Sequence, residues 1–91
     1  MNLHQLRVFC EVAETASFSA AAERLHMTQP AVTLQIKNLE EYYQIRFFQR
    51  TGKTVIPTEE GKVLLSIARQ MLDLARRGEE VIADLKGVKE E

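Results

Sequence analysis

Several residue types are scarce in this 91-residue sequence, and each scarcity excludes a class of protein. The single cysteine, Cys10, cannot form an internal disulfide and does not suffice for a cysteine-based zinc or iron–sulfur site. Two histidines are likewise too few for a histidine-rich metal site. A lone cysteine is typical of a reducing, intracellular setting, so we expect a cytoplasmic protein with no metal and no cofactor.

Long apolar runs, glycine and proline are scarce as well. No apolar run approaches the ~20 residues of a membrane span, and the amino terminus lacks the basic-then-apolar layout of a signal peptide. Four glycines and two prolines exclude a fibrous or low-complexity chain. Because 45% of the residues are apolar and only 27% are charged, we expect one folded unit with a real core and no membrane partner.

Excess positive charge, which most nucleic-acid-binding domains carry, is also missing from the total: 12 basic residues face 13 acidic ones, for a net charge of −1. This average hides three unlike regions. Residues 24–58 hold five basic and two acidic residues, for +3, whereas residues 1–23 and residues 59–91 each carry −2. The near-neutral total therefore does not exclude DNA as a partner.

Apolar residues at helical spacing predict two helices at the start of the chain. The first spans residues 2–15, with Asn2 as its N-cap and Gln5 as the capping-box partner. The second is shorter, with Ser19 as its expected N-cap and a run of alanines leading to Leu25. The small alanine side chains would allow close packing on another helix.

A third helix is expected after a short connector. Thr28 is its predicted N-cap, Pro30 lies in its first turn, where a missing N–H costs little, and the helix ends near residue 43. One face is apolar, with Val32, Ile36, Leu39 and Tyr43. The other face carries Gln29, Thr33 and Lys37, with Leu34 beside them.

A hairpin and a long helix are predicted to follow. Residues 46–50 and residues 54–57 are the expected strands, with a turn over residues 51–53 and a proline ending the second strand. Thr58 then begins a helix whose first turn is acidic, as the helix dipole favours.

The long helix, from residue 59 to about residue 86, carries a heptad seam of apolar or small residues. The seam residues are Leu64, Ile67, Met71, Leu74, Gly78, Val81 and Leu85. At ~1.5 Å per residue the helix would be about 42 Å long, too long to bury the seam on a domain of about sixty residues. We therefore predict a homodimer paired through this helix; the alternative is that the seam folds back on its own domain.

Three helices followed by a hairpin is the order of a winged helix-turn-helix, so the fold class is expected to be mainly α. We predict that residues 1–58 form this domain, with three helices and a two-stranded wing, and that residues 59–91 form a linker and dimerisation helix. In such a domain the third helix enters the DNA major groove. The candidate DNA-binding residues from this arrangement are Thr28, Gln29, Pro30, Thr33, Lys37, Arg50 and Lys53.

The chemistry of these side chains suits double-stranded DNA. Gln29 can pair bidentately with an adenine edge, and Thr33 can hydrogen-bond a base or offer its methyl group to thymine. Thr28 and the free N–H groups of the helix start suit a phosphate. Arg50 and Lys53 of the wing can reach a phosphate or a narrow minor groove.

Several motifs in the same order resemble the LysR-type transcriptional regulators. They occupy residues 6–9, 17–18, 21–40, 48–52 and 58–61, so the resemblance covers almost the whole chain. It implies bacterial gene regulation by a homodimer. The DNA contacts that it implies come from Gln29, Pro30, Thr33 and Leu34, and from a wing that includes Arg50, Thr51 and Lys53. For such a dimer we predict an interrupted inverted repeat, with half-sites spaced by helical turns of about 10 base pairs.

Two departures from the family pattern stand out. Position 34 is often basic or polar in the family, so Leu34 removes a possible guanine contact and leaves an apolar contact, for example with a thymine methyl. The effector-binding domain that follows the linker helix in the family is not in this sequence. We therefore expect a DNA-binding portion, with any small-molecule effector bound only by that missing domain.

Two other functions remain to be weighed. A winged helix can serve as a protein-interaction module without DNA binding, and the near-neutral charge favours that alternative. An enzyme is not expected, and no catalytic residue is predicted. The acidic pairs at 40/41, 59/60 and 79/80 point about 100° apart on a helix and do not converge, and no nucleophile–base pattern is present.

Overall fold

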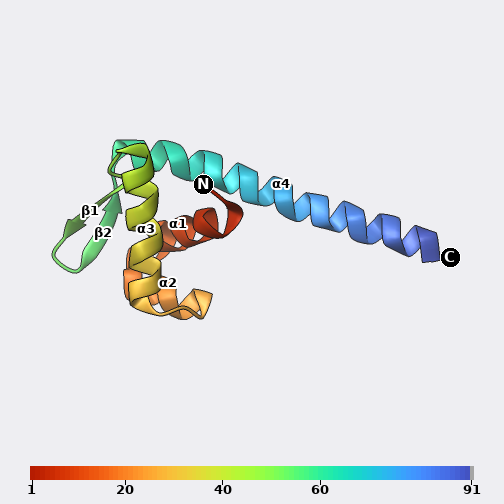
Figure 1. The fold of residues 1–91 in the computed structure, drawn as a ribbon, viewed down its shortest axis with the longest axis horizontal. Coiled ribbons are helices and arrows are strands. Elements are labelled where there is room, and N and C mark those ends of the chain that lie inside the picture. Colours follow the sequence, from red (N-terminus) through yellow and green to blue (C-terminus); the bar gives the residue numbers. More distant parts are fainter. Residues whose placement is uncertain (91) are drawn as a thin grey trace.

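A computed structural model describes residues 1–90, so the last residue of the segment predicted over 59–91 lies outside the described residues. The elements are α1 (Leu3–Thr15), α2 (Phe18–Leu25), α3 (Gln29–Tyr43), β1 (Phe48–Thr51), β2 (Thr54–Pro57) and α4 (Glu59–Glu90). The first three helices and the hairpin gather at one end, and α4 extends from them as a long arm (Figure 1). The predicted order and the mainly α fold class are confirmed.

The core forms where α1 meets α3, the start of α4 and residues 46–48, which we call the wing root. Its largest fully buried side chains are Leu6, Val8, Phe9, Val12, Val32 and Leu39. The ring of Phe9 packs against the rings of Phe47 and Phe48, with centroids 5.8 and 5.1 Å apart. Each such side chain contributes roughly 1.5–3 kcal/mol on burial, so this cluster sets how α3 and the wing lie relative to α1.

The start of α1 agrees with the prediction in one respect and differs in another. Asn2 is the N-cap, and its side-chain oxygen accepts a hydrogen bond from the backbone N–H of Gln5 at 2.8 Å. The capping box is not completed, because the Gln5 side chain donates to the Gln35 carbonyl of α3 at 3.3 Å. A tertiary contact has taken the place of the local one.

The start of α2 lies two residues earlier than predicted. Ser17, not Ser19, is the N-cap: its hydroxyl accepts from the N–H of Ala20 at 3.1 Å. Phe18, which precedes the expected N-cap in the sequence, opens α2 and is buried in the core. Burial of this ring fixes the helix start, which the local pattern of the sequence does not reveal.

The third helix follows the prediction closely. Thr28 caps it, accepting from the N–H of Ala31 at 3.2 Å, and Pro30 lies in the first turn. The expected apolar face is buried except at its last member, Tyr43, which is 40% exposed. Tyr43 lies at the end of α3, where its ring packs edge-on against the ring of Tyr42 rather than into the core.

The first strand is shorter than predicted because its first residues are bound elsewhere. The N–H groups of Phe47 and Phe48 donate to the Glu40 carboxylate at 2.7 and 3.3 Å. The carbonyls of Arg46 and Phe47 accept from the Thr58 hydroxyl and N–H. Residues 46 and 47, predicted as strand, therefore hydrogen-bond to α3 and to the residue that precedes α4. The strand β1 begins only at Phe48.

The start of α4 requires a close approach of two backbone segments. Thr58 begins the helix as predicted, with its hydroxyl accepting from the N–H of Gly61 at 3.0 Å. Gly61 lies directly against the carbonyl of Phe47, and a side-chain methyl group there would overlap that oxygen. Glycine at this position is what lets α4 leave the wing root in its observed direction.

Candidate nucleic-acid interface

The predicted DNA-binding residues of α3 lie together on its exposed side. Gln29, Pro30 and Lys37 are exposed, Thr33 is half-buried, and Leu34 is 54% exposed. These five side chains line one shallow hollow. Because the opposite face of α3 is anchored in the core, the hollow is presented outward on a rigid support.

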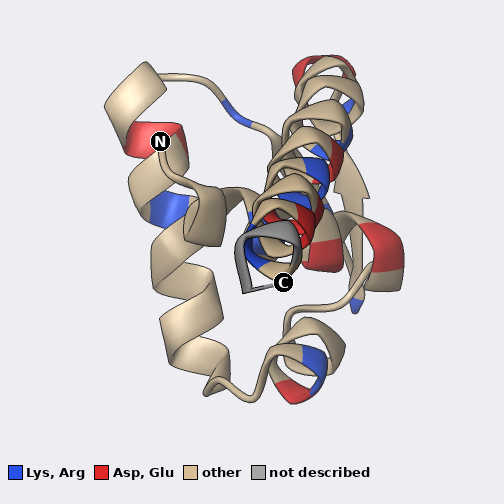
Figure 2. Cartoon of the chain, turned by 90° about the vertical axis from the view of Figure 1, so that its right-hand side faces the viewer, with Lys and Arg blue, Asp and Glu red and all other residues tan. Residues whose placement is uncertain are grey.

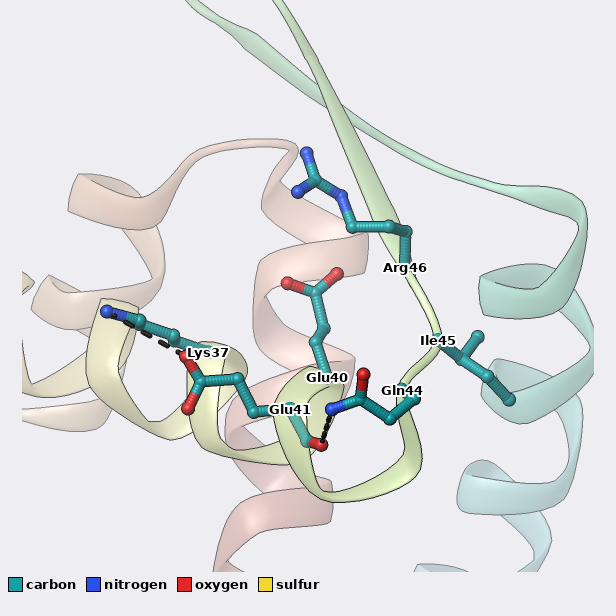
Figure 3. Close-up of a pocket in the computed structure, with 6 residues that line it drawn as sticks. All are labelled: Lys37, Glu40, Glu41, Gln44, Ile45 and Arg46. Carbon is teal, nitrogen blue, oxygen red and sulfur yellow. Dashed lines mark hydrogen bonds and ion pairs between the residues drawn. The ribbon is translucent and has the colours of Figure 1, made fainter.

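Lys37, farther along this face, has an acidic neighbour. Its Nζ lies 3.9 Å from a Glu41 carboxylate oxygen, one helical turn on, and both side chains are well exposed (Figure 3). An exposed pair of this kind contributes little stability, so a phosphate can replace the carboxylate as the partner of Lys37.

Glu40 has a structural role at the base of this region. It lines a hollow at the end of α3 together with Lys37, Glu41, Gln44, Ile45 and Arg46 (Figure 3). The Glu40 carboxylate is already bound by two N–H groups of the wing root. The adjacent carboxylates Glu40 and Glu41 thus have separate partners and do not form a paired acidic site.

The two wing cations lie in different places. Lys53 is exposed in the turn between the strands, where Gly52, at φ +61°, takes the first central position of the two-residue turn. Thr51 ends β1 opposite Thr54, rather than lying in the turn as predicted. Arg50 shares the inner side of the wing with the buried Val55, its partner across the strands.

A second hollow lies where the wing meets α2 and α3. The residues lining it are Ser17, Phe18, Ser19, Gln29, Arg50, Gly52, Lys53, Thr54 and Val55. It joins Gln29, Arg50 and Lys53, which lie far apart in the sequence. Ser17, Ser19 and Thr54 add hydroxyl groups that the sequence reasoning did not include. The one available signal for the serines was their position at the start of α2.

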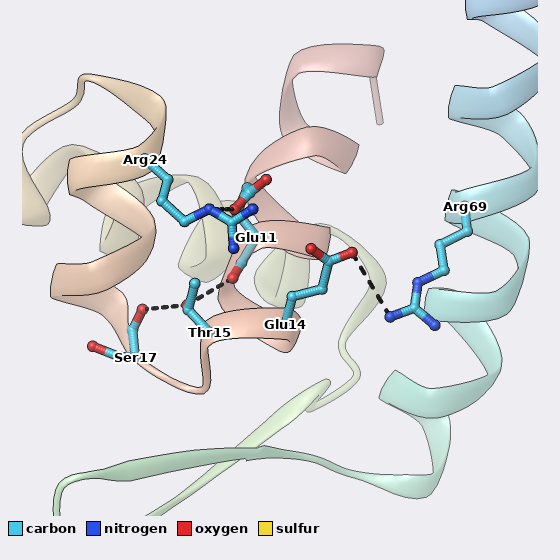
Figure 4. Close-up of polar contacts among 6 residues, drawn as sticks. All are labelled: Glu11, Glu14, Thr15, Ser17, Arg24 and Arg69. Carbon is cyan, nitrogen blue, oxygen red and sulfur yellow. Dashed lines mark hydrogen bonds and ion pairs between the residues drawn. The ribbon is translucent and has the colours of Figure 1, made fainter.

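Arg46 is a further cation that the sequence reasoning did not place in the site. It lines a third hollow, between α3 and β1, that also contains Thr33, Lys37 and Arg50. Arg24, by contrast, is paired with Glu11 of α1 at 3.0 Å, an ion pair without hydrogen-bond alignment (Figure 4). Of the five basic residues over 24–58, the four other than Arg24 lie on α3, the wing or the segment joining them.

A second ion pair links α1 to the long helix. Arg69 of α4 lies 3.8 Å from Glu14 of α1, with both side chains substantially exposed (Figure 4). Exposed ion pairs contribute at most about 1 kcal/mol each, so the core rather than these charges holds the helices together.

Cys10 is a core residue of α1. It is 7% exposed, and burial, reinforced by the negative charge of Glu14, raises the pKa of its thiol. The neutral thiol that results packs as a small apolar group. Among residues 1–90 no cluster of three or more potential metal ligands is found, and none of these helices is long and apolar enough to cross a membrane.

The long helix carries two apolar faces instead of one seam. Leu64, Leu65, Ala68 and Leu72 pack against the core of the same chain. A neighbouring face is open, with Val63 63%, Leu74 64%, Val81 56% and Leu85 56% exposed. Ile67 (48%) and Met71 (39%) belong to this open face as well. Leu64, a predicted seam residue, therefore lies against its own domain.

The distal half of α4 extends away from the rest of the chain, with acidic and basic residues interspersed along it (Figures 1 and 2). Arg76 is exposed there, and the hydrogen bond that it donates to the Asp73 carboxylate, together with the negative charge of Glu80, raises the pKa of its guanidinium. Such i,i+3 and i,i+4 pairs support an exposed helix by a few tenths of a kcal/mol each.

Comparison with known proteins identifies relatives over nearly the full sequence. Residues 3–62 match the family model described as bacterial regulatory helix-turn-helix protein, lysR family. A RuBisCO operon transcriptional regulator of Allochromatium vinosum is 43% identical over 97% of this chain. The transcriptional activator CmpR of Synechocystis is 38% identical over the same share. The chain spans 29% of the length of each of these two relatives.

Two solved protein–DNA complexes contain domains similar to this chain in sequence and in fold. The BenM DBD in complex with benA site 1 DNA is 32% identical, with a TM-score of 0.90, and the match covers 94% of this chain and 97% of that one. The CbnR DBD–DNA complex is 36% identical, with a TM-score of 0.84, over 93% and 99% of the two chains.

Proposed function

This chain belongs to the LysR family of bacterial regulatory helix-turn-helix proteins, and from that premise we propose that it is a DNA-binding module that recognises a specific double-stranded sequence as a homodimer. The family consists of regulatory proteins rather than enzymes. We place the module in the bacterial cytoplasm, as the DNA-binding part of a transcriptional regulator.

The observation that carries the proposal is the outward face of α3. Gln29, Pro30, Thr33, Leu34 and Lys37 line one exposed hollow, and the wing adjoins it. The α3 side chains at its amino-terminal end are uncharged, which suits base edges, whereas the cations stand around them, which suits phosphates. The protein-interaction alternative would need this polar face to be lost, and it is intact.

Within this face we assign separate roles. Gln29 and Thr33 read base edges in the major groove, and Leu34 with Pro30 makes apolar contact there. Thr28, Lys37, Arg50, Thr51 and Lys53 position the chain on the backbone. With Arg46, these residues include four cations near α3. So few cations give modest affinity to one copy, so binding depends on two copies on an inverted repeat.

The dimer contact is assigned to the open face of α4. Ile67, Met71, Leu74, Gly78, Val81 and Leu85 form its line, and most of them are about half exposed or more in the single chain. A row of this length and apolarity is covered in a stable protein, and a second copy of α4 supplies a matching row.

Selection of bound DNA from a random pool tests the proposed function directly. We expect enrichment of an interrupted inverted repeat whose half-site centres are separated by a multiple of about 10 base pairs. Enrichment of one unrepeated site would contradict binding as a symmetric dimer. No enrichment at moderate salt would favour the protein-interaction alternative.

The variants Gln29→Ala and Lys53→Ala separate base reading from phosphate binding. Gln29→Ala should cost roughly 1–3 kcal/mol of binding free energy and relax preference at one base position of each half-site. Lys53→Ala, the matched control on the wing, should weaken binding equally on all sequences and flatten the salt slope by about one unit per contact. Titrations on the selected site and on single-base variants measure both, and unchanged base preference in Gln29→Ala would refute its assignment.

A further inference from the structure

A cation of the wing contacts an aromatic ring of the helix-turn-helix. The Cζ atom of Arg50, in β1, lies 4.5 Å from the centroid of the Phe18 ring, at the start of α2. A guanidinium at this distance is attracted by the negative face of the ring. Phe18 is 9% exposed and held by the core, whereas Arg50 is exposed. The contact therefore ties a long, charged side chain to a rigid support.

The backbone fixes this contact from a second point. Val55, the partner of Arg50 across the hairpin, donates its N–H to the carbonyl of Ala16 at 3.1 Å. Ala16 lies only two residues before Phe18, and Val55 itself is buried. The inner side of the wing is thus held against the connection between α1 and α2, which brings Arg50 to the ring.

The position of Arg50 gives it access to both halves of the surface. It lines the hollow that contains Thr33 and Lys37 of α3, and also the hollow that contains Gln29 and Lys53. A backbone phosphate at the junction of α3 and the wing would meet this guanidinium. Arg–phosphate contacts of this kind set the register of a protein on the duplex.

We propose that Phe18 is a positioning residue for DNA binding: its ring holds Arg50 at the junction of α3 and the wing, ready for a backbone phosphate. The inference rests on the proposed function. A side chain already held in its bound orientation loses less conformational entropy when DNA binds. Phe18 itself touches no DNA and acts through Arg50.

A double-mutant cycle on the selected DNA, at several salt concentrations, tests the coupling. Arg50→Gln should weaken binding on every sequence and flatten the salt slope by about one unit. Phe18→Leu, which keeps apolar bulk, should weaken binding about two- to fivefold without changing the salt slope, since the ion contact still forms. In the Arg50→Gln background Phe18→Leu should have no further effect.

Phe18→Tyr is the matched control, because it retains the ring and should restore nearly wild-type affinity. Because Phe18 is buried, replacing it also changes the packing of the core. A second readout therefore uses the free wild-type chain and needs no variant. The side-chain proton resonances of Arg50 should be shifted upfield by the ring, relative to those of the exposed Arg77.

The outcomes distinguish failure of the Phe18 positioning role from failure of the proposed DNA-binding function. Equal losses from Phe18→Leu in both backgrounds, or unshifted Arg50 resonances, would overturn the positioning role and leave DNA binding in place. Failure of the wild-type chain to bind any DNA would overturn the proposed function, and this inference with it.

Discussion

Replacing Leu74 with aspartate should convert the proposed dimer to a monomer and weaken binding to an inverted repeat by about 10²- to 10⁴-fold. Leu74 is 64% exposed in the single chain and lies in the middle of the open face of α4. A carboxylate there would be buried in the dimer contact without a partner, which costs more than the contact gains. Because two linked half-site contacts give an avidity of that order, separate copies lose it.

Sedimentation and DNA titration together check this result. Ser66→Asp is the matched control: it makes the same change of charge at an exposed position of α4 outside the open face. It should remain dimeric and bind normally. A wild-type monomer at micromolar concentration, or a dimeric Leu74→Asp variant, would contradict the assignment of this face.

Gly61→Ala should destabilise the fold, although alanine is the better helix former. The added methyl group would overlap the Phe47 carbonyl and come within 3.3 Å of the Pro57 Cβ. Overpacking of this kind costs about 1–3 kcal/mol or more, and the overlap here is with backbone, which yields least. The gain of about 1 kcal/mol in helix propensity offsets only part of that cost.

Gly87→Ala is the control for this prediction, since nothing lies within 4 Å of a methyl group there. Its free energy of unfolding should not fall, and it should rise by up to about 1 kcal/mol from the gain in helix propensity. Urea melts followed by circular dichroism compare the two variants. Equal stabilities for Gly61→Ala and the wild type would show that the wing root shifts freely, contrary to the packing described above.

Most of the fold could be predicted from the sequence because its signals are local. Thr28 and Pro30 mark the start of α3, Thr58 marks the start of α4, and the second strand agrees residue for residue. The starts of α2 and β1 were misplaced for one reason. Phe18 and Phe47 are held by contacts with residues distant in the sequence, and no local pattern records such contacts.

The candidate site divides in the same way. The α3 residues from Gln29 to Lys37 were predictable as one face, because helical periodicity alone brings them together. Their junction with the wing was not predictable, since Ser17, Arg46 and the Phe18 ring come to share hollows with Arg50 only after the hairpin packs on α2. The seam of α4 was predicted as one line, but Leu64 is packed within its own domain.

The scarcities noted in the sequence already determined much about this protein. One cysteine, few glycines and no long apolar run excluded disulfide-rich, fibrous and membrane-spanning chains. Apolar periodicity predicted the helices, residues 24–58 held the excess of basic residues, and the ordered motifs indicated the family. Only the tertiary structure decided which cations remain near α3, because Arg24 pairs with Glu11 while Arg50 is held by Phe18. Periodicity records which side chains share a face of one element, whereas pairing between elements depends on how the core packs them.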